Sequence, residues 1–307
     1  MSKKIKSIKA TRYDMVYSET ADDHFEMVEN PLSLKEYDRA GNLILEANWG
    51  PGGVFSDKYE YHYEDGAKVK HFVYADAEEI GQTETYEYDA GGHLVKSITE
   101  YSDGSLDITT HKYDAAGHRV ESISVDEDGE AGQQEFWEYE GDKLAYYKRI
   151  NDFGDLEEEE RRKYDADGRL AERYFKNVPE ESEYKVLYSY DSEGRLILEQ
   201  KFNKRNKPVE DTSYEYDEQG NMIRETVENA LETIVRKRKY DEAGNEIETV
   251  ELEEVDEDEE DDIVRYEVVR EYDSEGRIIF SKVLINSTGD RPGAVYEVKT
   301  EYEFWED

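Results

Sequence analysis

Apolar and aromatic residues occupy every second position along most of the chain, with polar residues between them. Residues 94–101 and residues 105–113 are two such stretches, and both are rich in β-branched and aromatic side chains. A period of two is typical of β-strands, and no stripe with the 3.6-residue period of a helix competes with it. The pattern therefore predicts an all-β fold.

A Tyr-Asp pair, with a Gly three residues after the Asp, recurs between these stretches. Its spacing from Tyr37 to Tyr240 runs from 24 to 26 residues, and the next interval, to Tyr272, is 32. Variant copies, one with Asp and two with Glu after the Tyr, fill the gaps between the full ones. The Asp and Gly of the seven full copies are Asp38 and Gly41, Asp114 and Gly117, Asp165 and Gly168, Asp191 and Gly194, Asp217 and Gly220, Asp241 and Gly244, and Asp273 and Gly276. With a strand on each side of every pair, the sequence predicts ten β-hairpin repeats of about 25 residues.

The Tyr-Asp-x-x-Gly sequence, in which x is any residue, has the chemistry of a type I turn. The Asp side chain accepts hydrogen bonds from backbone amides ahead of it, and the Gly supplies the positive φ needed to re-enter a strand. The Tyr and the residue two positions before it share one face of the sheet. That second position is aromatic in five repeats, for example Trp137 and Tyr188, and basic in most others, for example Arg238 and Arg270. Stacked repeats would therefore build ladders of aromatic rings with basic side chains laid over them.

The array runs over residues 31–307, and residues 1–30 form an N-terminal cap with a degenerate half-repeat at Tyr13 and Asp14. About twenty strands exceed what an open, twisted sheet usually holds before it curls. We therefore expect a long curved or spiral antiparallel sheet with exposed strand edges at its two ends. A β-propeller is the alternative, because two hairpins of this length would make one four-stranded blade.

Repeated Tyr-Asp-x-x-Gly followed by an alternating apolar strand resembles the YD repeat of the Rhs family. The resemblance covers about residues 31–302, and its specificity rests on the number of copies. In that family the repeats form a continuous antiparallel ribbon that spirals, and in long members the ribbon closes around a toxin domain. This chain departs from the family in its longer period and in having no toxin segment after Tyr302. The resemblance implies the sheet architecture of a stand-alone array, and it does not imply the toxin.

Acidic residues dominate the composition: 79 Asp and Glu against 39 Lys and Arg give a formal net charge of −40. The small share of aliphatic side chains is typical of a disordered chain, but the 26 tyrosines supply the bulk that a folded sheet needs. The charge excludes DNA or RNA binding through a basic surface. The absence of cysteine excludes disulfides, thiolate zinc sites and thiol nucleophiles. Because we find neither an apolar run long enough for a membrane helix nor a signal peptide, we expect a cytoplasmic protein.

The sequence contains no catalytic motif: there is no nucleophile elbow, no zinc-protease helix and no phosphate-binding glycine loop. Five of the six histidines fall within residues 62–118. His93 and His118 directly follow turn glycines, at a position where other repeats carry Asn or Arg, which favours a solvated turn over a metal ligand. We therefore expect a protein that is not an enzyme and that holds neither a metal nor another cofactor.

The expected function is that of a non-catalytic scaffold that captures a protein partner on an extended acidic β-surface. The charge favours a basic partner, a toxin or a nucleic-acid-binding protein, and no membrane is expected to be involved. The Rhs resemblance implies an immunity protein that neutralises a toxin. The alternatives are a carbohydrate or cell-surface binding protein, in which Tyr and Trp rings stack on sugars, and a DNA mimic.

Two acidic runs, interpreted as solvated loops, and two aromatic rings are the predicted partner-binding residues. The acidic runs are also candidates for weak binding of divalent cations. For the rings, packing within the sheet is the favoured interpretation. The residues are Glu157, Glu158, Glu159 and Glu160; Asp256, Glu257, Asp258, Glu259, Glu260, Asp261 and Asp262; and Trp137 and Tyr188.

Overall fold

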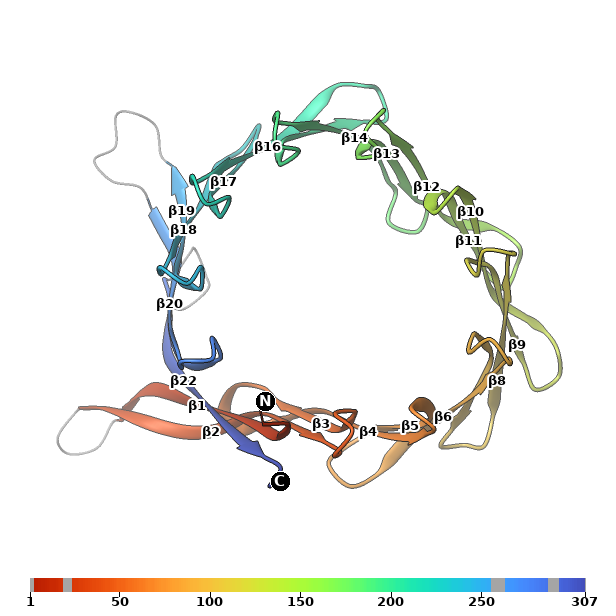
Figure 1. The fold of residues 1–307 in the computed structure, drawn as a ribbon, viewed down its shortest axis with the longest axis horizontal. Helices are drawn as coiled ribbons and strands as arrows, with labels where there is room; N and C mark the ends of the chain where they lie inside the picture. The colour runs from red at the N-terminus through yellow and green to blue at the C-terminus, as the bar shows by residue number, and fades with distance from the viewer. Residues whose placement is uncertain (1–2, 19–23, 255–262, 287–292, 307) are drawn as a thin grey trace. The chain divides into compact units, whose positions relative to one another are not determined.

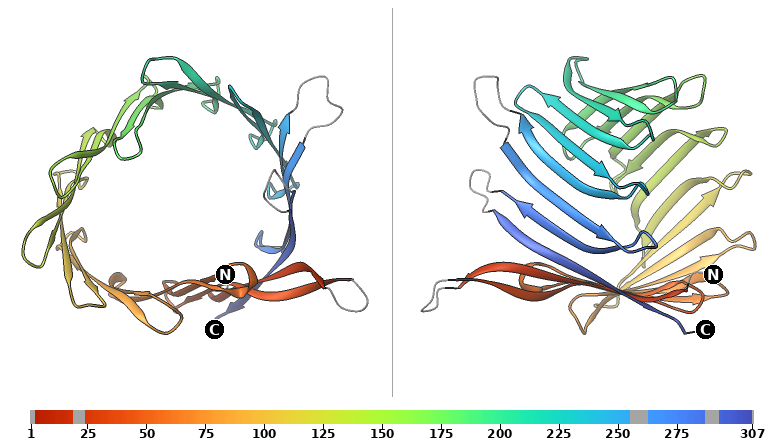
Figure 2. Two further views of the ribbon diagram at one scale, coloured as in Figure 1. Left: turned by 180° about the vertical axis from the view of Figure 1, so that it is seen from behind. Right: turned by 60° about the vertical axis from the view of Figure 1, so that its left-hand side comes forward.

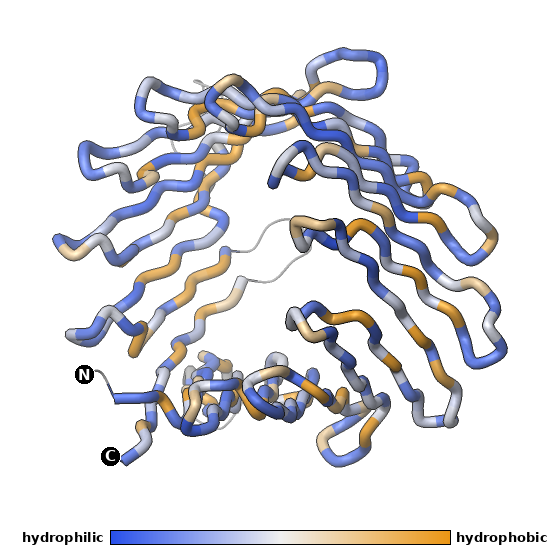
Figure 3. Tube along the Cα trace, turned by 45° about the vertical axis from the view of Figure 1, so that its right-hand side comes forward, coloured by the Kyte–Doolittle hydropathy of each residue, from blue (hydrophilic) through white to orange (hydrophobic). Residues whose placement is uncertain are grey.

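A computed structural model describes residues 3–18, 24–254, 263–286 and 293–306 (Figure 1). Within these residues every regular element is a β-strand except the 3-10 helix η1 (Pro51–Gly53). The all-β prediction is therefore confirmed. The alternation of apolar and polar residues along the strands is visible in Figure 3.

The chain divides into two compact units. Unit 1 comprises Met1–Glu60, Asp76–Glu78 and Ser213–Asp307, and unit 2 comprises Tyr61–Ala75 and Glu79–Thr212. Two strands carry the boundaries, β4 (Phe55–Glu64) and β16 (Pro208–Tyr216). The boundary predicted at residue 30 falls inside β2 (His24–Tyr37).

Unit 1 holds the strands from both ends of the chain. Besides β2 they are β1 (Ile5–Ser18), β3 (Leu43–Trp49), β17 (Met222–Asn229), β18 (Thr233–Tyr240), β19 (Glu246–Glu254), β20 (Ile263–Tyr272), β21 (Ile278–Ile285) and β22 (Ala294–Phe304). Each of these strands pairs antiparallel with the next one along the chain from β1 to β4 and from β17 to β22.

Unit 2 is an uninterrupted series of antiparallel hairpins. Its strands are β5 (Ala67–Tyr74), β6 (Ile80–Tyr88), β7 (Leu94–Tyr101), β8 (Leu106–Tyr113), β9 (Arg119–Asp126), β10 (Ala131–Glu140), β11 (Lys143–Ile150), β12 (Leu156–Tyr164), β13 (Leu170–Asn177), β14 (Ser182–Tyr190) and β15 (Leu196–Asn203). Consecutive strands pair throughout.

The first and last strands of the chain pair with each other. β1 and β22 run antiparallel, from Ile5 opposite Phe304 to Asp14 opposite Tyr296, and lie side by side in Figure 1. β1 is therefore bonded on both sides, to β2 and to β22. All 22 strands belong to one sheet, which thus closes in its hydrogen-bonding order, as in a β-barrel. The predicted open or spiral sheet with free end strands is wrong, and so is the propeller, which would consist of separate sheets.

Side chains at both ends of the chain reinforce this pairing. The Trp305 indole Nε1 donates to the backbone oxygen of Asp38 (3.1 Å), and the Arg39 guanidinium lies 4.8 Å from the Trp305 ring centre. The Trp305 amide donates to the backbone oxygen of Lys4 (3.0 Å). No turn glycine follows Tyr302, so the repeat pattern gave no sign of these contacts.

The recurring turns are built by the Asp side chain. In the first copy Asp38 Oδ1 accepts hydrogen bonds from the amides of Gly41 (2.8 Å) and Asn42 (2.9 Å). A bond from the Asn42 side chain and these backbone bonds lower the pKa of Asp38. The Gly of the seven full copies has a φ between 76° and 100°, a region that favours glycine.

The turn Tyr ties each hairpin to the one before it. Its hydroxyl donates to a backbone oxygen at the start of the second strand of the preceding hairpin, over 2.7–3.2 Å. The donors and acceptors are Tyr88 and Lys68, Tyr113 and Leu94, Tyr139 and Arg119, Tyr164 and Leu144, Tyr190 and Leu170, Tyr240 and Met222, Tyr272 and Glu246, and Tyr302 and Ile278. This bond explains why the position holds Tyr rather than Phe.

In each unit the strands have two ends and the sheet has two faces. The Tyr-Asp turns lie at one end of the strands and the other loops lie at the opposite end (Figure 2). We call the face that carries the turn tyrosines the tyrosine face. Charged residues lie on both faces of a strand such as β12, with Glu158 and Glu160 on the tyrosine face and Glu159 and Arg161 on the other.

Candidate functional site

The tyrosine face of unit 1 is hollowed between β19 and β2. This groove encloses ≈ 740 Å³ and is lined from β19, β20, β21, β22, β1 and β2. Because directly paired residues of an antiparallel sheet share a face, the strand register fixes which side chains line it.

Short side chains form the floor of the groove. Val268 pairs with Val283, and Ser281 pairs with Val298, so these four residues lie on one face of three adjacent strands. Ile285, the last residue of β21, extends the apolar surface toward the end of the strands opposite the Tyr-Asp turns and is 39% exposed. The floor is therefore apolar and open to solvent.

The hollow exists because this part of the array lacks bulk. In β12 the position four residues before the turn Tyr holds Glu160, which pairs with Phe175. The matched positions in β20 and β21 hold Val268 and Val283. The Phe175 ring packs against Tyr184 at 5.2 Å and fills that part of unit 2, whereas two valines leave space.

Three arginines stand around the floor. Arg12 on β1 lies 3.7 Å from the Tyr296 ring centre and is paired with Asp14 at 2.6 Å. Asn30 donates a hydrogen bond to the same carboxylate (3.1 Å), which fixes the pair. This guanidinium therefore forms one rim of the groove.

Arg265 forms the rim near the start of β20. Its Nη2 contacts Glu232 and, at 2.9 Å, Glu253. Partial burial opposes its charge, yet the hydrogen bonds to the two carboxylates raise the pKa of Arg265. Its Nε is buried and has no hydrogen-bond partner among the residues that the structure describes. Such a donor is costly to leave unpaired.

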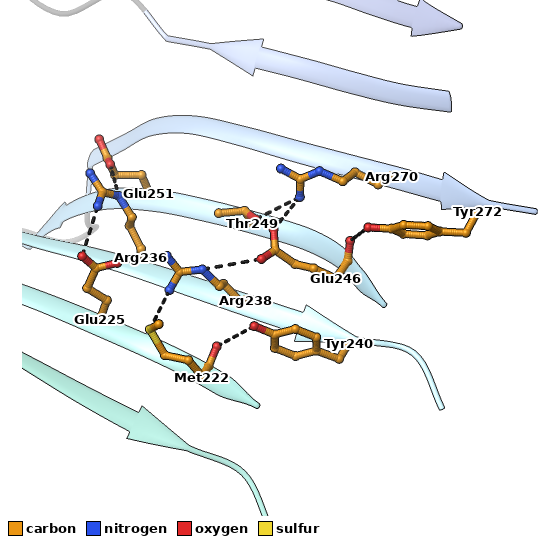
Figure 4. Close-up of polar contacts among 10 residues, drawn as sticks. All are labelled: Met222, Glu225, Arg236, Arg238, Tyr240, Glu246, Thr249, Glu251, Arg270 and Tyr272. Atoms are coloured by element: carbon orange, nitrogen blue, oxygen red, sulfur yellow. Dashed lines mark hydrogen bonds and ion pairs between the residues drawn. The ribbon is translucent and has the colours of Figure 1, made fainter. Parts of the chain in front are cut away.

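Arg270 reaches the groove from near the end of the same strand, two residues before Tyr272. Its Nη1 donates to Glu246 Oε1 (2.6 Å) and to Thr249 Oγ1 (3.1 Å). Glu246 also approaches Arg238 on β18, and Figure 4 shows how these side chains follow one another across the sheet. Within the described part of the chain, no hydrogen bond engages Nε or Nη2 of Arg270.

The arrangement combines a half-buried apolar floor with guanidinium groups that keep unused donors. A guanidinium presents five N–H donors in a planar fork, which matches the geometry of a carboxylate. The neighbouring Glu and Asp side chains orient the arginines without occupying every donor. The groove can therefore hold a molecule that has both a hydrocarbon part and an anionic group.

The acidic run Glu157–Glu160 does not form the predicted loop. It lies in β12, and Glu159 and Glu160 are 9% and 5% exposed. Arg173 contacts Glu160 at 2.8 Å and Arg149 contacts Glu158 at 3.3 Å. The loop interpretation is wrong because arginines on neighbouring strands neutralise the run. Asp256–Asp262, the second predicted acidic loop, lies outside the described residues.

The two predicted aromatic residues lie on the tyrosine face of unit 2. Arg119 covers the Trp137 ring at 4.7 Å, and Tyr147 packs beside it at 5.6 Å. Tyr188 is half-buried, and burial raises its pKa. Both rings are engaged within the sheet, and neither is among the residues that line the groove.

The sequence analysis missed the groove residues Arg12 and Arg265. A partial signal was present, since Arg238 and Arg270 were recognised as basic residues two positions before a turn Tyr. Among the described residues no group of three His, Cys, Asp or Glu side chains could hold a metal ion. The described residues also include no helix long and apolar enough to cross a membrane.

Comparison with known proteins identifies no family. No family model matches the chain, and no curated protein matches its sequence. A solved structure of a porin-like protein from Bacteroides uniformis is similar over 97% of this chain and 98% of its own, with 9% sequence identity and a TM-score of 0.33. The resemblance to the Rhs family stays a prediction.

The closed sheet corrects the expected function and location. The scaffold and immunity functions were derived from an open array with a long free surface, and the β1–β22 pairing removes that array. The carbohydrate-binding and DNA-mimic alternatives were derived from the aromatic rings and the acidic charge of the same open array. Bacterial outer-membrane proteins are built as closed antiparallel sheets with an even number of strands, as this sheet is. The cytoplasmic location and the protein partner without a membrane are therefore overturned as well. They rested partly on the lack of a long apolar run, which a sheet does not need.

Proposed function

We propose that this chain binds a small amphipathic carboxylate in the groove of unit 1. The hydrocarbon part lies on Val268, Val283 and Val298, and the carboxylate accepts hydrogen bonds from Arg265 and Arg270. The proposal includes no chemical step, in keeping with the expectation that the chain is not an enzyme.

One observation carries the proposal: Arg265 Nε is buried at the groove without a hydrogen-bond partner among the described residues. A buried donor of this kind calls for an acceptor, and Arg265 lines the groove, so a ligand bound there can supply one. Arg270 offers further donors on the same strand. In a chain of net charge −40, two such groups beside an apolar floor mark the groove as a place for an anion.

The expected affinity is modest. Each buried methylene contributes about 0.8 kcal/mol, and a hydrogen bond to a charged group contributes roughly 1.5–3 kcal/mol. Ordering and desolvation oppose these gains, so a ten-carbon carboxylate should bind with a dissociation constant of about 10–100 µM.

Isothermal titration calorimetry with decanoate tests the proposal, with decanol as the uncharged comparison. The Val283→Phe variant places in the groove the ring that Phe175 supplies in unit 2, and it should weaken decanoate binding by at least about tenfold because the floor is filled. The control is Val269→Phe, on the same sheet but the opposite face, which should bind like the parent chain.

Two results would contradict the proposal. Absence of any decanoate binding by the parent chain up to millimolar concentration would exclude this ligand class. Equal loss of binding in both Phe variants would show that the ligand does not lie in the groove.

A further inference from the structure

Six charged residues on the tyrosine face of unit 1 form one alternating series. In order they are Glu251, Arg236, Glu225, Arg238, Glu246 and Arg270, contributed by β17, β18, β19 and β20 (Figure 4). The two ends of the series, Glu251 and Arg270, both line the groove. The position of a groove residue therefore depends on side chains that do not touch the groove.

Glu246 is shared between two arginines. Its Oε1 accepts from Arg270 Nη1 at 2.6 Å, while its Oε2 lies 3.6 Å from Arg238 Nε. Thr249 also donates to Glu246 Oε1. The carboxylate thus divides its charge between the groove arginine and an arginine outside the groove.

Arg238 is held firmly in place. Its side chain is only 16% exposed, its Nη2 donates to Glu225 (2.9 Å), and its Nη1 lies 3.2 Å from the Met222 sulfur. It therefore acts as a fixed positive charge behind Glu246. Without it, Glu246 would have Arg270 as its sole cationic partner among the described residues.

We propose that Arg238 is a positioning residue that sets the affinity of the groove for a carboxylate. By attracting Glu246, it weakens the internal ion pair with which a ligand carboxylate competes for Arg270. This inference rests on the proposed function, because it concerns the same ligand and the same arginine. It assigns Glu246 as the internal competitor and Arg238 as the residue that restrains it.

A double-mutant cycle on decanoate binding tests the inference. Glu246→Gln keeps the shape of the side chain but removes the competing charge, so decanoate should bind roughly three- to tenfold more tightly. Arg238→Met leaves the whole charge of Glu246 on Arg270, so binding should weaken by a similar factor, roughly three- to tenfold. The double variant should bind like Glu246→Gln, because Arg238 acts through Glu246.

Three controls separate positioning from general damage. Decanol affinity should not change in any of the variants, since decanol presents no carboxylate to Arg270. Lys239→Met, which removes the neighbouring cation on the opposite face, should leave decanoate affinity unchanged; the Lys239 amine pairs with Glu248 at 2.6 Å. Arg238→Lys should recover part of the lost affinity.

The possible failures are distinguishable. If the parent chain binds decanoate but Arg238→Met and Glu246→Gln leave its affinity unchanged, the inference fails and the proposed function stands. If Arg238→Met weakens decanoate and decanol equally, the residue supports the fold and does not position Arg270. If the double variant binds as weakly as Arg238→Met, Arg238 does not act through Glu246.

Discussion

The tyrosine faces of the two units are built on the same hairpin repeat and differ in the side chains that they carry. Between β12 and β14 in unit 2, Glu160, Phe175 and Tyr184 fill the surface with a buried ion pair and packed rings. Between β20 and β22 in unit 1, valines leave a hollow, and the ionic groups form an alternating series at its side. The side chain four residues before the turn Tyr and the side chain paired with it on the next strand thus distinguish the packed surface of unit 2 from the groove of unit 1.

The largest expected difference between the two units is how much their ion pairs contribute to the free energy of unfolding. Arg173→Met removes one of the two arginine partners of Glu160, which is 5% exposed and keeps Arg162. The variant should destabilise the protein by about 2 kcal/mol, because a nearly buried carboxylate loses part of its charge compensation. Arg270→Met should cost less than about 1 kcal/mol, because Glu246 is more exposed and keeps Arg238. Urea unfolding at pH 7 measures both.

The matched control is Lys163→Met, which removes an exposed pair with Glu172 and should shift stability by less than about 0.5 kcal/mol. Equal losses for Arg173→Met and Arg270→Met would contradict the distinction between a buried ion pair in unit 2 and a partly exposed one at the groove.

The turn tyrosines should contribute equally in both units. Tyr164→Phe in unit 2 and Tyr272→Phe in unit 1 each remove one hydrogen bond to a backbone oxygen, of 2.9 Å and 2.7 Å, and should each cost about 1 kcal/mol. Urea midpoints of the two variants should coincide. A loss in one unit alone would mean that the bond is part of the local packing rather than of the repeat.

The smallest expected effect is a pH dependence of the free energy of unfolding that arises in unit 2. His111 in unit 2 is half-buried: its Nδ1 lies 2.9 Å from Ser122 Oγ, and its Nε2 has no partner within the described residues. Burial, assisted by the charge of Arg119 and opposed by that of Glu135, lowers its pKa below the ordinary 6.5. The unfolded chain therefore takes up this proton first as pH falls, so stability should decrease below pH 6.5 and be unaffected above it.

Urea midpoints at pH 7.5 and 5.5 measure this dependence. His111→Asn should reduce the loss at pH 5.5, whereas His93→Asn, at an exposed turn position, should leave it unchanged. An identical loss in the parent chain and in His111→Asn would rule out His111 as the source.

The strands could be predicted from the sequence, because they depend on local alternation. The pairing of distant strands could not be predicted. Alternation in residues 94–101 and 105–113 identifies strands because each residue's face depends only on its immediate neighbours. The pairing of β1 with β22 brings together residues far apart in the sequence. Trp305 reinforces it, and no local pattern indicates its partners Asp38 and Lys4.

The groove was hidden for a related reason. It arises where Val268, Val283 and Ser281 take the positions that Glu160, Phe175 and Arg173 hold in unit 2. Such an absence of bulk is visible only once the register is known. The run Glu157–Glu160 was misinterpreted as a loop because its neutralising partners, Arg149 and Arg173, come from other strands. Like charges adjacent in sequence were separated by cations in space.

The pairing of β1 with β22 has a consequence for synthesis on the ribosome. Strand β1 is made just before β2 and meets it at once, but its other partner, β22, follows all the other described strands. One side of β1 thus remains available for wrong partners until β22 has been made, and such long-range pairing is slow to form. A circular permutant of residues 4–305, with Trp305 joined to Lys4 through a short linker and new ends at another turn, would keep every strand pair. Only the strand whose second partner is made last would change.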